Sequence, residues 1–234
     1  MNSSNPTLAF TPDALEVVGV ARVAYLRKVY SYFGLGMLGG VIGSLIAMNT
    51  GLALFMAHNF FIGIIALFGM LFLANKNAAN PATALPTLFA FTFVSGVILS
   101  PTLFFIARRY IPGIGVEVIY EALFLTSLIF AGLTAYVFVT KKDFTYMGAT
   151  LMIGLFLVIG VSLVNLFFAS ANVSLAVAVV TSILFSGFIL YDTSRIIRNA
   201  HAVPPTMAAL SLYLDFLNLF MALLQILTGG RRRN

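Results

Sequence analysis

The 234-residue sequence contains no cysteine. This absence excludes disulfide bonds, thiolate catalysis and cysteine-ligated zinc or iron–sulfur centres. Only two histidines are present, His58 and His201, and neither has a second histidine at the helical spacing that zinc sites use. We interpret both as loop residues rather than metal ligands.

The sequence is also poor in charge and rich in apolar residues. Only 9% of its residues are charged and 61% are hydrophobic, whereas about 25% of the residues in an average soluble domain are charged. A soluble domain of this length leaves about a quarter to a third of its surface exposed, and here that surface would have to be apolar. The sequence therefore predicts an integral membrane protein whose partner is the lipid bilayer.

Motifs typical of enzymes and of nucleic-acid binding are missing. The sequence has no HExxH motif, no glycine-rich phosphate loop and no GxSxG motif with a histidine placed to activate it. We therefore expect no enzymatic activity and no required cofactor. The basic residues behind the net charge of +6 lie in small groups between apolar runs. This pattern is typical of topology determinants and excludes nucleic acid as a partner.

Long uncharged stretches divide into seven segments that can cross a bilayer. A spanning helix needs about 20 predominantly apolar residues, and residues 29–75 and 144–191 contain no Asp, Glu, Lys or Arg. Polar, glycine and proline residues mark the breaks between segments. We predict an all-α membrane protein with seven transmembrane helices, at 29–49, 57–75, 83–107, 119–139, 147–168, 174–197 and 206–228.

These spans form one transmembrane domain, 29–228, between a polar N-terminal tail, 1–28, and a basic C-terminal tail, 229–234. The tail lacks the pattern of a secretory signal, so we expect it to be retained. With this tail in the cytoplasm, eight of the thirteen Lys and Arg residues fall on the cytoplasmic side. The positive-inside rule therefore favours a cytoplasmic N-terminus, although the cluster Arg231–Arg233 opposes it.

The first span carries two overlapping pairs of glycines, Gly36 with Gly40 and Gly39 with Gly43. Pairs of small residues at this spacing let helix backbones approach closely inside a membrane. We favour packing within one chain as their role, with a dimer interface as the alternative.

Two aspartates within the last two spans are the main candidates for chemistry. A carboxylate near the bilayer centre costs at least about 2.5 to 3.5 kcal/mol. Asp192 and Asp215 lie on consecutive antiparallel helices, at depths of about 10 and 15 Å from their shared turn. Two carboxylates about 4 Å apart repel by about 4 kcal/mol at an effective dielectric of 20, so such a pair shares one proton and titrates as a unit. When deprotonated, it offers oxygen ligands suited to calcium.

A local alternative is open for each aspartate. Asp192 can pair with Arg195, three residues along the same helix, and Asp215 can hydrogen-bond a neighbour such as Asn218. We favour the aspartate pair, because Asp215 has no basic residue within its own span.

Two further acidic residues, Glu117 and Glu121, lie one helical turn apart near Arg108 and Arg109. They can gather cations at the mouth of a pore. Ion pairing at the membrane interface is the alternative that we favour.

Three segments carry a family resemblance: AYVFVTKKDFTYMGATL, ILYDTSRIIRN and SLYLDFLNLFMALLQIL. Their order and spacing resemble the transmembrane Bax inhibitor motif family, of the Bax inhibitor-1 type. This resemblance implies a central C-terminal helix surrounded by six others, and a pH-dependent calcium leak controlled by two aspartates. By motif, these are Asp192 and Asp215. An arginine that can lock one aspartate in such relatives has no counterpart in the second span, so its latch is absent or is replaced by Arg195 or Arg198.

The KKDF and TSRII segments also resemble the bacterial subgroup of modulators of the FtsH protease. That subgroup implies a protein of the bacterial inner membrane that binds and regulates a membrane protease without transporting anything. The N-terminal tail would be the segment that binds the protease. A secondary transporter for protons or a small cation is a third reading. The sequence shows no internal repeat of the kind that many such transporters have.

Overall fold

The computed structural model describes residues 12–109, 114–198 and 202–231. This part of the chain is helical, with one short 3₁₀ turn and no strand. The elements are α1 (Pro12–Asn49), α2 (Leu52–His58), α3 (Phe60–Asn77), α4 (Pro81–Arg109), α5 (Ile114–Thr140), the 3₁₀ turn η1 (Thr145–Met147), α6 (Gly148–Phe168), α7 (Ala171–Arg198) and α8 (Pro205–Arg231).

Seven of these helices are long and apolar enough to cross a membrane, which confirms the predicted number of spans. Only α2 is too short, with seven residues. It occupies the predicted break between the first two spans. Gly51 precedes it with a φ of 75°, a left-handed conformation that glycine adopts without steric cost.

The first helix is longer than the sequence predicted. We expected the first span to begin at residue 29, whereas α1 begins at Pro12 and its apolar stretch begins at Gly19. The basic residues Arg22, Arg27 and Lys28 mark the end of the uncharged run, but Arg and Lys are good helix formers and do not end a helix. The residues from Pro12 to Lys28 therefore continue the spanning helix.

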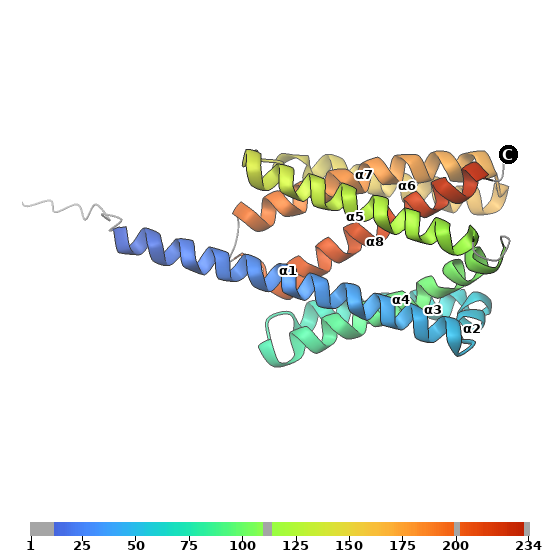
Figure 1. The fold of residues 1–234 in the computed structure, drawn as a ribbon, viewed down its shortest axis with the longest axis horizontal. Helices are drawn as coiled ribbons and strands as arrows, with labels where there is room; N and C mark the ends of the chain where they lie inside the picture. The colour runs from blue at the N-terminus through green and yellow to red at the C-terminus, as the bar shows by residue number, and fades with distance from the viewer. Residues whose placement is uncertain (1–11, 110–113, 199–201, 232–234) are drawn as a thin grey trace, which may run out of the picture.

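Helix α8 occupies the centre of the bundle. It runs obliquely between α1–α4 on one side and α5–α7 on the other (Figure 1). In its most apolar window 61% of the residues are buried, against 6% in the corresponding window of α6. It packs against α1, α4, α5 and α7, while α3 and α6 lie at the periphery. The C-terminal span is therefore the central helix, as the resemblance implied.

The close crossing of α1 and α4 depends on glycine. A β-carbon on Gly96 of α4 would collide with the carbonyl oxygen of Gly40, and one on Gly43 would collide with that of Phe93. The glycines of the first span therefore serve packing within the chain, which is the interpretation that we favoured.

Candidate functional site

Asp192 and Asp215 are buried beside one another in the bundle. Asp192 lies near the C-terminal end of α7 with 7% of its surface exposed, and Asp215 lies on α8 with 4% exposed. The two helices pack against each other. Their carboxyl groups are close enough to repel when both are ionised and to share a hydrogen bond once one is protonated. The structure therefore brings together the two residues that the sequence singled out.

The local partners of the two aspartates are unequal. Nη1 of Arg195 lies 3.9 Å from Oδ1 of Asp192, so the local ion pair that we weighed as an alternative is present, at long distance. The side chain of Arg195 is 41% exposed. Oδ2 of Asp215, by contrast, is buried without a hydrogen-bond partner. The amide of Asn218 donates to the carbonyl oxygen of Leu214, at 2.7 Å, and not to Asp215.

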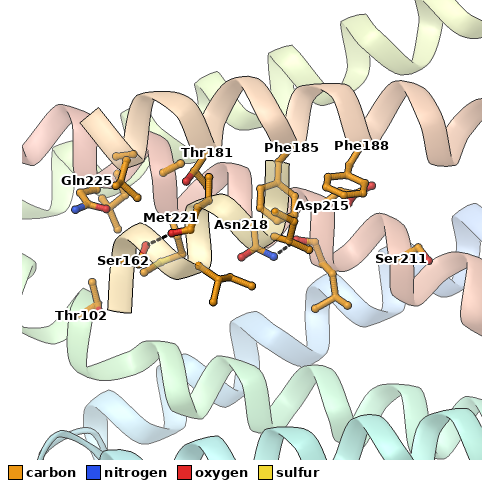
Figure 2. Close-up of a pocket in the computed structure, with 18 of the residues that line it drawn as sticks. Thr102, Ser162, Thr181, Phe185, Phe188, Ser211, Asp215, Asn218, Met221 and Gln225 are labelled. Carbon is orange, nitrogen blue, oxygen red and sulfur yellow. Dashed lines mark hydrogen bonds between the residues drawn. The ribbon is translucent and has the colours of Figure 1, made fainter. Parts of the chain in front are cut away.

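Both aspartates line a cavity of about 1030 Å³ between α3, α4, α6, α7 and α8. Figure 2 shows Asp215 and Asn218 on one wall, with Phe185 and Phe188 of α7 beside them. A polar stripe follows the cavity face of α8. Its members recur at the spacing of one helix face: Ser211, Asp215, Asn218, Gln225 and Thr228.

The sequence analysis did not identify Ser211, Gln225 and Thr228 as members of this stripe. It considered Asn218 only as a hydrogen-bond partner of Asp215. Steps of three, four and seven residues along one span were the available signal.

The cavity continues toward both ends of the bundle. At the end where α6 turns into α7, a pocket of about 420 Å³ shares Ser162, Val177 and Gln225 with it. At the other end, a void of only about 10 Å³ shares Asp192 and Arg195 with it. Together these spaces form a line along the bundle with one narrow point.

Tyr25 stands at this narrow point. It lines the small void, and with Val203 it also lines an outer pocket of about 600 Å³ beside Lys28 and Pro204. The Tyr25 hydroxyl donates a hydrogen bond of 3.1 Å to the carbonyl oxygen of Val203. This bond ties α1 to the turn before α8, and the two residues that it joins line both the void and the outer pocket.

Arg198 binds the loop between α5 and α6. Its Nη2 donates to the carbonyl oxygen of Lys141 at 2.8 Å, and its Nε lies 3.5 Å from Oδ1 of Asp143. Hydrogen bonds from the hydroxyl and the backbone amide of Thr145 lower the pKa of Asp143, and the charge of Arg198 lowers it further. Of the two arginines considered as replacement latches, only Arg195 therefore has an ion pair with a cavity aspartate.

Glu117 and Glu121 do not line the aspartate cavity. Both are exposed near the start of α5. The start of α5 and the C-terminal end of α7 lie at opposite ends of the bundle (Figure 1). The described part of the chain contains no group of three or more acidic or histidine side chains that could hold a metal ion. His58 is exposed, and its Nδ1 lies 2.8 Å from the carbonyl oxygen of Leu54, while His201 lies outside the described residues.

Known proteins are similar in sequence to this chain over most of its length. The family profile described as "Inhibitor of apoptosis-promoting Bax1" matches residues 22–233. An uncharacterised protein of Campylobacter jejuni is 38% identical over 89% of this chain and 90% of its own length. Bax inhibitor 1 of Schizosaccharomyces pombe is 33% identical over 93% of this chain and 80% of its own. The modulator of FtsH protease YccA of Escherichia coli is 36% identical over 72% and 74%. This chain is a multi-pass membrane protein that belongs to the Bax inhibitor-1 family.

Proposed function

We propose that this protein is a pH-sensitive cation leak of the bacterial inner membrane, with calcium as the ion and with Asp192 and Asp215 as both sensor and ligand. The observation that supports this proposal is the line of cavities along the bundle, in which both carboxyl groups line the main cavity and Asp192 also lines the void at the narrow point. In this proposal the N-terminus faces the cytoplasm, so that Tyr25 and Arg195 lie toward the cytoplasmic side.

The mechanism follows from the charge of the pair. Two ionised carboxylates in a weakly polar site repel each other, and a divalent cation between them removes that repulsion. When one carboxyl group takes up a proton, the site loses one negative charge and one ligand. That proton can then be shared between one oxygen of each carboxyl group. Occupancy by calcium and occupancy by a proton therefore compete, which makes the flux depend on pH.

Arg195 affects this competition between calcium and protons. Because it lies 3.9 Å from Asp192 and its side chain is 41% exposed, it can offset one carboxylate charge while staying accessible from outside the cavity. In the proposed mechanism Arg195 replaces the arginine that the second span lacks.

Calcium flux into proteoliposomes tests this function. We expect wild-type protein to show flux that changes with pH, and the double variant Asp192→Asn with Asp215→Asn to lose that dependence. Glu117→Gln is the matched control, since it also removes a carboxylate from a span but lies outside the cavity. An unchanged pH profile in the double variant would refute the role of the aspartates, and an absence of flux in wild type would refute the leak.

Modulation of a membrane protease is the second candidate. The observation that favours it is the 36% identity to a relative named as a modulator of FtsH protease. The residues before α1 can be removed without shortening the helix, so deletion of residues 2–11 is a sharper test than a deletion into α1. We expect co-purification with the protease to fall and calcium flux to be retained. Undiminished binding after the deletion would show that the N-terminal tail is not the segment that binds the protease.

A further inference from the structure

The aspartate cavity has an open side. Four of its apolar lining residues are well exposed, at 65% for Phe68 of α3, 51% for Phe105 of α4, and 47% and 45% for Met152 and Ile159 of α6. Residues that line a closed cavity are buried. These four therefore form the rim of an opening.

The peripheral helices α3 and α6 stand on either side of this opening. Within the described residues, α3 packs on α2 and α4, and α6 packs on α7 and η1. They make no extensive contact with each other. The opening therefore lies between two membrane-spanning helices and faces sideways.

The depth of the rim identifies what surrounds it. Phe68 lies halfway along the span Phe60–Asn77, and Ile159 lies near the middle of Thr145–Phe168. The middle of a span lies in the hydrocarbon core of the bilayer, where acyl chains are the surrounding medium and water is scarce.

The two walls of the cavity differ in polarity. The α8 wall carries the polar stripe, whereas the walls of α6 and α7 near the opening are apolar, with Leu155, Val158, Phe185 and Phe188. Water against these side chains would be unfavourable. An apolar chain would pack favourably against these side chains and would leave the polar stripe on α8 free.

We propose that an acyl chain of a bilayer phospholipid enters between α3 and α6 and occupies the apolar side of the aspartate cavity. The volume of about 1030 Å³ provides the room, since it lies at the upper end of the range of about 300 to 1,000 Å³ for pockets that enclose drug-sized molecules. The chain narrows the space beside the polar stripe. This site does not depend on the cation leak, because it follows from the opening and the apolar walls alone.

The absence of tryptophan from the sequence offers a direct test. A single tryptophan placed in the cavity wall by Phe185→Trp is the only indole in the protein, and its fluorescence is quenched on contact with bromine. The variant is reconstituted in phosphatidylcholine with bromine atoms midway along or near the end of the acyl chain.

Two matched phenylalanines provide the controls. Phe156 is 68% exposed on α6, so Phe156→Trp reports full contact with lipid. Phe130 is 7% exposed, as is Phe185, but it packs in the core against Phe33 and Phe216 and lines none of the cavities described above. All three positions lie near the middle of their spans. Phe130→Trp therefore reports a buried side chain at the same depth without access to the cavity.

We expect brominated lipid to quench Phe185→Trp nearly as strongly as Phe156→Trp and several-fold more strongly than Phe130→Trp. Quenching no stronger than that of Phe130→Trp would overturn the proposal. Quenching by aqueous iodide in place of brominated lipid would also overturn it, and would indicate a water-filled cavity. If Phe185→Trp fails to fold, Phe188→Trp, which lines the same cavity, takes its place with the same expectations.

Discussion

The hydroxyl group of Tyr25 donates a hydrogen bond to the carbonyl oxygen of Val203, across 178 positions of the sequence. This bond joins the N-terminal part of α1 to the turn that precedes the central helix. The two residues that it joins line both the outer pocket and the void beside Asp192. Its energetic and functional contributions can be separated by experiment.

Tyr25→Phe removes this hydrogen bond and keeps the ring. We expect the free energy of unfolding to fall by about 1 kcal/mol, and the calcium flux of the proposed leak to rise because the narrow point is no longer tied shut. Thermal unfolding in detergent and flux into proteoliposomes measure the two effects. Tyr32→Phe is a matched control on the same helix, since Tyr32 packs on the separate cluster around Leu88 and Phe91. Equal effects of both substitutions would contradict the role of Tyr25.

The crossing of α1 and α4 predicts a sharp contrast between two glycines of one helix. Gly43→Ala forces a β-carbon against the backbone of Phe93, and overpacking of this kind costs about 1 to 3 kcal/mol. The β-carbon added by Gly34→Ala meets nothing within 4 Å. Because alanine has a higher helix propensity than glycine, this substitution should leave the free energy of unfolding unchanged or raise it by up to about 1 kcal/mol. Unfolding temperatures in detergent provide the comparison. A similar loss in both variants would contradict the packing described for this crossing.

The loop anchored by Asp143 predicts a stability difference that depends on pH. The pKa of Asp143 is lowered by Thr145 and Arg198, so the ionised carboxylate stabilises the folded state. That stabilisation is present above the ordinary aspartate pKa of about 4 and is lost as the pH falls through the lowered pKa. We therefore expect Asp143→Asn to be less stable than wild type at neutral pH, and the difference to shrink in acid. A difference that grows as the pH falls would contradict this assignment.

Much of the fold could be predicted because hydropathy follows the bilayer. Each uncharged run between polar breaks corresponds to one helix, and the seven spans were found in this way. The start of α1 was missed for the same reason. Basic residues such as Arg22 and Lys28 end an apolar run, but backbone hydrogen bonding continues through them, and hydropathy does not report it.

The position of the aspartates was also predictable, since antiparallel neighbours joined by a short turn match in depth. The partner of Arg198 was not predictable. It binds Lys141 and Asp143, more than fifty residues earlier, and only the packing of η1 against α7 brings that loop to it. The side opening of the cavity was hidden from the sequence as well, because lipid-facing and cavity-facing positions on α3 and α6 are equally apolar.

In the proposed leak, two carboxyl groups, on α7 and α8, act as one unit. The pair is tested by the change of calcium flux with pH in wild type, in Asp192→Asn, in Asp215→Asn and in the double variant, in which we expect no such change. Groups that share a proton give strongly non-additive effects, so we predict that either single substitution removes nearly as much of the pH dependence as both together. Losses of pH dependence that simply add would show that the two residues titrate independently, and would contradict a shared proton.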